Sequence, residues 1–406
     1  MIEHLRAARG LQTGFLRELV RIPTDNPPGD LAAAAERVAA LLEALGLPVE
    51  RYPVSPGRAA AAGLVGCTNL IVRRRFGPGP TVALNAHADV VPPGDGWTYP
   101  PYAGEEHDGW LYGRGAAVSK SDIATYAFAT LALDHAEELH GTVELHVTFD
   151  EESGGALGPK LILADGFSHP DLAICAGFSY GVTTAHNGAL HLEVEVSGRS
   201  AHAARPQNGV DALEAATAIL TALYALRPGL ARHTSPIAGI GAPQLTVGLI
   251  AGGTATNVVP DRVTFRLDRR IVPEEDAAIV EAALRDVIAT AAAGFAATVA
   301  MRRTLLAEPL TPLPGTDRLT DLLCRHAEAV FGLPVPAGGV PLYTDARHYA
   351  AAGVPVALYG AGPRTIEEAN AHRADERVRP SDMHLATEVI ALTLRDLLRQ
   401  PALGTP

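Results

Sequence analysis

Two short motifs in this chain combine side chains that can bind a metal ion with side chains that can move a proton. The first is His87-Ala-Asp89, and the second is the tandem pair Glu151-Glu152. A histidine followed two residues later by a carboxylate can ligate a metal while the carboxylate orients the ring. Of two adjacent glutamates, one can ligate and the other can transfer protons. The two motifs together predict a metal-activated hydrolytic centre.

Both motifs follow apolar runs that have the character of buried strands. Residues 81–84 precede His87, and residues 142–149 precede Glu151. Residues 126–139 can supply a helix between these strands, and such alternation predicts a mostly parallel sheet with helices on both faces. Ligands of these sheets bind beyond the carboxyl ends of the strands. Both motifs therefore fall where a site is expected.

The pattern changes over residues 185–305, which predict a separate small domain. The expected elements, in order, are a strand at 190–196, a helix at 210–226, strands at 244–250 and 261–271, a helix at 274–293 and a strand at 297–304. This β-α-β-β-α-β order is that of a split ferredoxin-like unit. We therefore predict an α/β catalytic domain formed by residues 1–184 and 306–406, with the ferredoxin-like domain inserted at 185–305.

The composition is that of an ordinary globular protein, with 47% hydrophobic and 19% charged residues among 406. A net charge of −12 argues against nucleic acid as a partner. The three cysteines form no Cys-x-x-Cys pair and predict neither disulfides nor a cysteine zinc site. No apolar stretch reaches the roughly 18 residues of a membrane helix, and the N-terminus lacks a signal-peptide pattern. We expect a cytoplasmic protein without a membrane partner.

The motifs resemble one family nearly end to end. In order along the chain, they are His87-Ala-Asp89-Val-Val-Pro92, Tyr112-Gly-Arg-Gly-Ala116, Glu151-Glu152, Ser200-Ala-His202 and Ala371-His372-Arg-Ala-Asp375-Glu376. This set is similar to the zinc aminohydrolases that include aminoacylase, acetylornithine deacetylase, succinyl-diaminopimelate desuccinylase and carboxypeptidase G. The resemblance implies a zinc aminopeptidase-like catalytic domain with an inserted dimerisation domain.

The resemblance also implies roles for residues that match the family's motifs. Glu151 would be the general base that takes a proton from metal-bound water. Asp89 would stand behind His87 as its orienting partner. The metal ligands that remain in this chain would be His87, Glu152 and His372.

The inserted domain would supply the remaining site residues that the resemblance implies. Asn257 and Arg270 would bind the substrate carbonyl or carboxylate, together with His202, which would reach into the partner subunit's site. The resemblance therefore implies a homodimer formed through the inserted domain. It also implies a small-molecule substrate that bears a carboxylate.

Two positions depart from the family's ligand pattern. Val118 stands where two metals would share a bridging aspartate, and no carboxylate lies between Asp171 and Glu193, where a further acidic ligand is expected. An alkyl side chain cannot coordinate a cation, and two unbridged divalent ions roughly 3.5–4 Å apart would repel each other. We therefore predict one ion rather than two, with zinc as the first expectation and manganese or cobalt as alternatives.

Three interpretations of this altered centre stay open. In the first, His87, Glu152 and His372 hold one catalytic ion, and the protein hydrolyses an amide-type C–N bond, non-peptide or dipeptide-like, in a small carboxylate-bearing substrate. In the second, another side chain replaces a lost ligand: Asp122, His186, Glu367 or Glu368. In the third, no catalytic metal binds, and the chain is a non-catalytic small-molecule binding protein. The first is the interpretation that we favour.

Overall fold

The computed structural model describes residues 1–399, which form two compact units. Unit 1 comprises Met1–Thr184, Pro312–Gly338 and the chain from Thr344 onward, and unit 2 comprises Ala185–Thr311 and Gly339–Tyr343. Each unit has its own cluster of buried apolar side chains. In sequence, unit 2 is thus an insertion into unit 1. It extends past residue 305 and takes in a short second segment.

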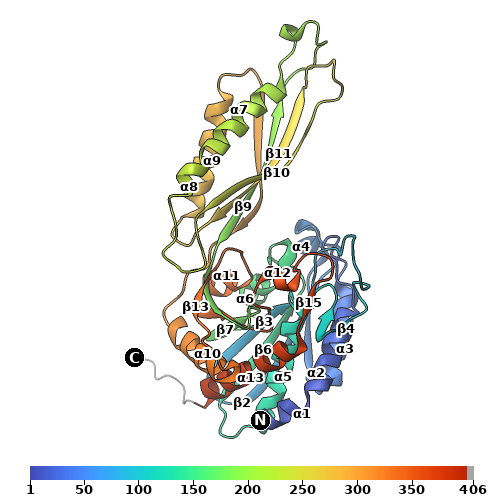
Figure 1. Cartoon of the computed structure of the whole chain (residues 1–406), viewed down its shortest axis with the longest axis vertical. Coiled ribbons are helices and arrows are strands. Elements are labelled where there is room, and N and C mark those ends of the chain that lie inside the picture. The colour runs from blue at the N-terminus through green and yellow to red at the C-terminus, as the bar shows by residue number, and fades with distance from the viewer. Residues whose placement is uncertain (400–406) are drawn as a thin grey trace. The chain divides into compact units, whose positions relative to one another are not determined.

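An eight-stranded sheet is the central element of unit 1 (Figure 1). The sheet contains a parallel core of four strands, in the order β6, β3, β7 and β14. The flanking pairs β1–β2, β2–β6 and β14–β8 are antiparallel. In spatial order the strands are β1 (Val49–Pro53), β2 (Thr68–Gly77), β6 (Gly141–Thr148), β3 (Thr81–His87), β7 (Leu172–Cys175), β14 (Val356–Leu358), β8 (Val182–His186) and β13 (Ala337–Val340).

Both faces of this sheet are covered. Every residue of β6 is buried, as is every residue of β3 after the first. Successive side chains of a strand point to opposite faces, so such continuous burial requires packing on both sides. The sequence-based prediction of a mostly parallel sheet between helices is confirmed.

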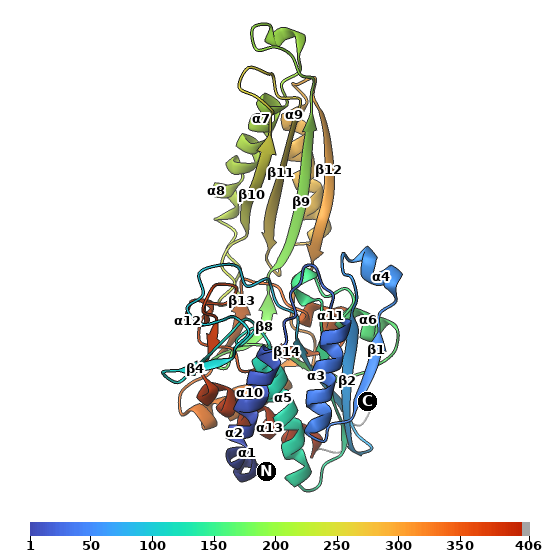
Figure 2. The same ribbon diagram turned by 90° about the vertical axis from the view of Figure 1, so that its right-hand side faces the viewer.

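Helices α5, α10 and α13 pack together on the sheet, and α6 and α11 form a separate pair on it (Figure 2). The helices of unit 1 are α1 (Ile2–Ala7), α2 (Arg9–Val20), α3 (Ala32–Ala44), α4 (Pro56–Ala61), α5 (Lys120–Ala132), α6 (Pro159–Ala164), α10 (Thr316–Phe331), α11 (Ala346–Ala351), α12 (Ile366–Ala369) and α13 (Pro380–Leu398). A small second sheet has the order β15 (Arg377–Val378), β5 (Trp110–Tyr112), β4 (Glu105–His107). Within residues 1–399, no helix has the length and apolarity needed to cross a bilayer.

Unit 2 consists of an antiparallel four-stranded sheet and its helices. The sheet order is β10-β11-β9-β12. Along the chain the elements are β9 (Gly188–Ser197), α7 (Ala212–Ala225), α8 (Arg227–Leu230), β10 (Gln244–Gly252), β11 (Arg262–Ile271), α9 (Ala277–Ala292) and β12 (Thr298–Ala307). Strand β11 lies between β9 and β10, so the first crossover is split, as in a ferredoxin-like fold. Asp211 and Asp276 cap α7 and α9, each accepting two backbone N–H groups.

Candidate active site

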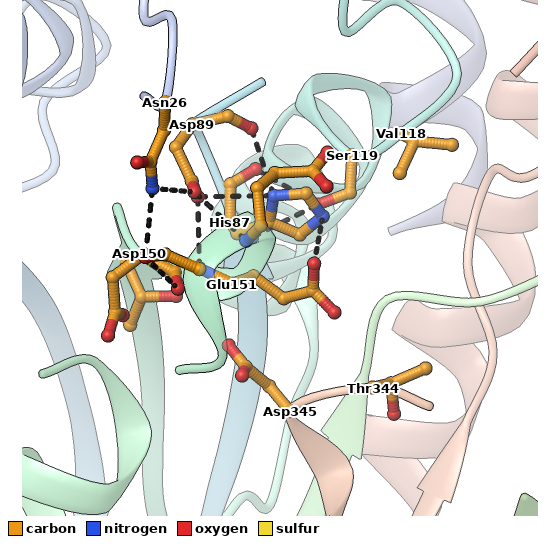
Figure 3. Close-up of polar contacts among 12 residues, drawn as sticks. Asn26, His87, Asp89, Val118, Ser119, Asp150, Glu151, Thr344 and Asp345 are labelled. Atoms are coloured by element: carbon orange, nitrogen blue, oxygen red, sulfur yellow. Dashed lines mark hydrogen bonds and ion pairs between the residues drawn. The ribbon is translucent and has the colours of Figure 1, made fainter. Parts of the chain in front are cut away.

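The two motifs meet at one edge of the large sheet. Strands β3 and β6 are parallel neighbours, and their register places His87 beside Thr148. Because the carboxyl ends of parallel strands meet at the same edge, the segment after β6 reaches the end of β3. That segment contains Asp150 and a short 3-10 helix, Glu151–Ser153. The topology therefore brings His87 and Glu151 together from distant parts of the sequence (Figure 3).

His87 is buried, and its position is set by hydrogen bonds on two sides. Its Nδ1 lies 3.0 Å from the backbone oxygen of Asp89 and 3.3 Å from a carboxylate oxygen of the same residue. The hydroxyl of Ser119 accepts from the backbone N–H of His87 and donates to its carbonyl, both at 3.0 Å. With Nδ1 turned toward oxygen acceptors, Nε2 is the ring nitrogen left to bind a metal. Nε2 lies 3.9 Å from Oε2 of Glu151.

Asp89 holds the second motif in place through its fully buried carboxylate. This carboxylate accepts hydrogen bonds from Nδ2 of Asn26 at 2.9 Å, from the backbone N–H of Glu151 at 3.3 Å and from that of Glu152 at 3.1 Å. Hydrogen bonds to a charged group are stronger than those between neutral groups. Asp89 therefore positions both glutamates, a role beyond the orientation of the histidine ring.

Three side chains form a group that can hold a metal ion. One ligand atom each from His87, Glu151 and Glu152 lies within 4.8 Å of the other two. His372 has a half-exposed side chain, and its Nε2 lies 3.1 Å from Oε1 of Glu152. Among residues 1–399, however, no three-ligand group includes His372. The structure thus groups His87 with Glu152 and places His372 in contact with Glu152.

The charges of this group favour a bound cation. Burial raises the pKa of Glu151 to about 7; the charges of Glu152 and Asp89 add to this effect, and His87 opposes it. Burial lowers the pKa of His87, but its hydrogen bond to Asp89 and the charges of the two glutamates raise it well above 6.5. Both side chains therefore hold protons more tightly than usual, Glu151 mainly because it is buried and His87 because carboxylates surround it. Nitrogen and carboxylate donors in such surroundings fit a divalent ion.

Val118 brings no coordinating atom to this centre. Its backbone N–H donates to Oε1 of Glu376 at 3.1 Å, and its side chain packs against the apolar core. Glu376 is buried, pairs with Arg114 at 2.6 Å and accepts a second backbone N–H, from Ala117. The loop before α5 is therefore held through Glu376, whatever the side chain at position 118. A second metal ion would find no bridging ligand at this position.

None of the possible replacement ligands joins the group. Asp122 lies in the first turn of α5, and its Oδ1 accepts the backbone N–H of Ala361 at 2.7 Å. Glu367 and Glu368 lie in the first turn of α12, where Glu368 accepts a backbone N–H. His186 is the last residue of β8, and its Nδ1 lies 2.9 Å from the backbone oxygen of Asn187. The structure supports no rebuilt ligand set from these residues.

Asp345 lies beside Glu151 (Figure 3). Its side chain is 5% exposed, and neither carboxyl oxygen has a hydrogen-bond partner within the described chain. Burial raises the pKa of Asp345 to about 7, and the negative charge of Glu151 adds to this effect. Nearby, Arg347 donates from Nη2 to the carbonyl of Gly154 at 2.5 Å and from Nη1 to that of Thr344 at 2.6 Å.

The residues expected to bind the substrate belong to unit 2. His202 and Asn257 lie on adjacent segments, which are joined by a bond of 3.0 Å from the N–H of Ala203 to the carbonyl of Asn257. Arg270, near the end of β11, donates from Nε to Asp268 at 3.0 Å. That these side chains bind the substrate stays a prediction.

Comparisons with known sequences place the chain in a family. The peptidase family M20/M25/M40 matches residues 83–396. The succinyl-diaminopimelate desuccinylase of Gluconacetobacter diazotrophicus is 30% identical over 397 residues, covering 94% of this chain and 96% of that protein. The enzyme of the same name from Rhodospirillum rubrum is 29% identical over 406 residues, covering 95% and 98%.

Solved structures share the fold at lower sequence identity. Human carnosine dipeptidase 1 aligns with a TM-score of 0.76 and 19% identity over 98% of both chains. An M20 family metallo-carboxypeptidase of Sulfolobus solfataricus, Sso-CP2, aligns with a TM-score of 0.77 and 17% identity over 95% of this chain and 98% of that one. The resemblance stated from the motifs is confirmed. The chain belongs to the peptidase family M20/M25/M40 and is a hydrolase that acts on amide-type C–N bonds.

Proposed function

We propose that this protein is an amidohydrolase that uses a single divalent metal ion, with Glu151 as its general base. The observation that carries this proposal is the contrast between two neighbouring parts of one site. His87, which is buried, and Glu151 and Glu152, which are partly buried, form a carboxylate-rich ligand group. Val118, at the position of the bridging ligand, offers only an alkyl side chain. The ligands present are therefore enough for one metal ion, and the carboxylate that would bridge two metal ions is missing.

We assign the ion, with zinc as the first expectation, to His87, Glu152 and His372. His87 and Glu152 already belong to the ligand group. His372 contacts Glu152, and its half-exposed side chain has room to turn toward the ion. This assignment leaves Glu151 free to act as a base. The competing ligand set is His87, Glu151 and Glu152, and the metal content of a Glu151 variant distinguishes the two sets.

Glu151 is suited to carry the proton in amide hydrolysis. A bound divalent ion lowers the pKa of its water toward ~7 and polarises a substrate carbonyl. Glu151 accepts the proton that the attacking water loses and delivers it to the amide nitrogen, after which the C–N bond breaks. Its pKa of about 7, raised by burial, allows the carboxyl to take up and release a proton near neutral pH. Asp89 keeps the carboxyl in place through the backbone of the 3-10 helix.

We propose an N-acylated amino acid as the class of substrate. The two relatives described above are named for removal of a succinyl group from diaminopimelate, a substrate that carries carboxylates. The guanidinium of Arg270 and the amide of Asn257 have the chemistry to bind a carboxylate or a carbonyl. We further propose a homodimer formed through unit 2, in which His202 acts in the partner subunit's site.

Substitution of Glu151 tests the proposed base directly. We expect Glu151→Gln to lower kcat by on the order of 10²–10⁴-fold, the usual contribution of general acid–base catalysis, while metal content stays unchanged. His87→Ala should lose both metal and activity, and Glu137→Gln, at an exposed position, is the control. Turnover retained in Glu151→Gln would contradict the base role. Metal lost in Glu151→Gln would assign Glu151 as a ligand.

A further inference from the structure

The carboxylate of Asp345 lies at the site but has no task in the chemistry proposed above. The residue directly precedes α11, and its side chain is directed toward Glu151 (Figure 3). Only 5% of the side chain is exposed, and yet neither oxygen accepts a hydrogen bond from any described residue. A buried carboxylate without a donor costs several kcal/mol. Asp345 is therefore suited to accept a hydrogen bond from a bound molecule.

The basic side chains nearby do not supply that donor. Arg347 directs Nη1 and Nη2 to the backbone oxygens of Thr344 and Gly154. Nε2 of His348 lies 3.9 Å from Oδ1 of Asp345, beyond hydrogen-bonding distance. The charge of Arg347 acts on Asp345, yet neither carboxyl oxygen of Asp345 has a hydrogen-bond partner among the described residues.

The surrounding backbone accommodates this carboxylate in a defined position. Gly155 has a φ of +65°, and a Cβ at that residue would collide with Oδ1 of Asp345. On α11, the hydroxyl of Tyr349 forms a hydrogen bond of 2.7 Å with Nδ1 of His146, which lies on β6. The helix that follows Asp345 is thereby tied to the strand that leads to Glu151. The spacing of the two carboxyl groups is therefore set by the fold.

We propose that Asp345 binds the leaving nitrogen of the substrate. This inference rests on the proposed function, because it places the departing amine next to the base that protonates it. Asp345 would accept a hydrogen bond from the N–H of the scissile amide and then pair with the ammonium group that forms. Its negative charge would stabilise the positive charge that develops on nitrogen as the C–N bond breaks. Asp345 would thus favour amides over esters.

The step balances without a further reactant. The oxygen of water forms a bond to the acyl carbon, and the C–N bond breaks. One proton of the water passes through Glu151 to the nitrogen, and the second, released by the acid that is formed, converts the amine to an ammonium ion. At neutral pH the products are a carboxylate and an ammonium ion, of which Asp345 pairs with the ammonium ion.

The first test compares an amide with its matched ester. N-succinyl-L-alanine and O-succinyl-L-lactate differ only in NH against O at the scissile bond. We expect Asp345→Asn to lower kcat/KM for the amide about 10- to 100-fold, the range for loss of a charged hydrogen bond, and to leave the ester within about threefold. Gly155→Ala, which would displace the carboxylate, should shift the ratio in the same direction. An equal loss on both substrates would overturn the proposal.

Asp122→Asn is the matched control, because Asp122 is also a buried carboxylate but already accepts a backbone N–H. It should leave the ratio of amide to ester activity unchanged, whatever it does to stability. A change in the ratio in this control as large as that in Asp345→Asn would also overturn the proposal.

The second test measures equilibrium binding and needs no turnover. By calorimetry on metal-loaded protein, wild type should bind L-alanine, which carries an ammonium group, about tenfold more tightly than L-lactate, and Asp345→Asn should abolish this preference. Absence of the preference in wild type, or its persistence in the variant, would overturn the role of Asp345. If neither succinyl compound is cleaved, the proposed function fails for this substrate, and the binding preference still tests Asp345.

Discussion

At the scale of single residues, the site depends on its candidate metal ligands and equally on side chains that accept hydrogen bonds from the backbone. Asp89 accepts from Asn26 and from the backbone N–H groups of both glutamates. Glu376 does the same for the loop that contains Val118. These buried carboxylates hold two loops at the carboxyl edge of the sheet. The loss of one ligand therefore need not disturb the loop that carried it.

Asp89→Asn tests whether the positioning of the two glutamates affects metal binding, because Asp89 is not itself a proposed metal ligand. The amide keeps the shape of the side chain but loses its charge and turns one acceptor into a donor. We expect a loss of about 1.5–3 kcal/mol in the free energy of unfolding, the range for hydrogen bonds to charged groups, and a metal affinity that is about 10–100-fold weaker. Denaturant titration and metal titration measure the two effects. Unchanged metal affinity would contradict the positioning role.

Val118→Asp should change the number of ions bound. Because Glu376 holds the backbone at position 118, an aspartate there should present its carboxylate without rearrangement of the loop. We expect the metal content to rise from about one ion per chain toward about two, since a bridging carboxylate reduces the repulsion between ions. Val118→Leu should leave the content unchanged. If the aspartate variant binds no more metal than wild type, the explanation of the single ion is wrong.

The sequence predicted much of the site because its main residues lie in local motifs after strands. His87, Glu151 and Glu152 could be found in this way, and Val118 stood out in an otherwise matching segment. Asn26 could not be found, since it reaches the site through tertiary contacts that leave no spacing signal. The contact of His372 with Glu152 likewise depends on the path of a loop.

At the scale of elements, periodicity predicted the central strands and the order of the elements in unit 2. The helix expected over 126–139 differs, because α5 begins at Lys120 and ends at Ala132. Residues 119–121 are polar, yet the fold buries them. Lys120 donates from Nζ to the carbonyl of Ile22 at 2.8 Å, and Ser119 bonds the backbone of His87. Tertiary hydrogen bonds therefore explain a helix start that hydrophobic periodicity could not locate.

The buried surroundings of Glu144, a residue of β6, should make stability depend on pH. Burial alone would raise the pKa of Glu144, but His146, Ser168 and Arg73 outweigh burial and lower it to about 2. A carboxyl with a lowered folded pKa stabilises the protein above its unfolded value, about 4.5, and loses this effect as pH falls toward 2.

Glu144→Gln should accordingly have a lower Tm than wild type at pH 7, and this gap should narrow steadily below about pH 4.5. Calorimetric scans over a pH series measure the gap. Glu137→Gln, at an exposed position, should show no such pattern. A gap that is constant with pH would contradict the assignment of a lowered pKa to Glu144.

At the scale of the whole molecule, the chain contains two separate apolar cores. Strands β9 and β11 of unit 2 alternate buried and less buried residues along most of their length, so one face packs against helices. The central strands of unit 1 are buried on both faces. The change from continuous to alternating apolar pattern is what allowed the inserted unit to be predicted from sequence. Its exact limits could not be, because Gly339–Tyr343 joins it from a distant part of the chain.

Core substitutions should therefore act mainly on the unit that contains them. Phe265 is fully buried in the core of unit 2, and Phe128 is buried in that of unit 1. We expect Phe265→Ala to cost about 3–5 kcal/mol and to increase hydrogen exchange chiefly over residues 185–311, with metal content unchanged. Phe128→Ala should increase hydrogen exchange chiefly in unit 1. Equal increases across both units in either variant would show that the two cores unfold as one.

The metal content of protein purified without chelator tests the central claim most directly. We expect elemental analysis to find about one divalent ion per chain, as the donor set allows, and His87→Ala to lose it. Two ions per chain in wild type would contradict a mononuclear centre. No ion under any loading condition would contradict a metal-dependent hydrolase altogether.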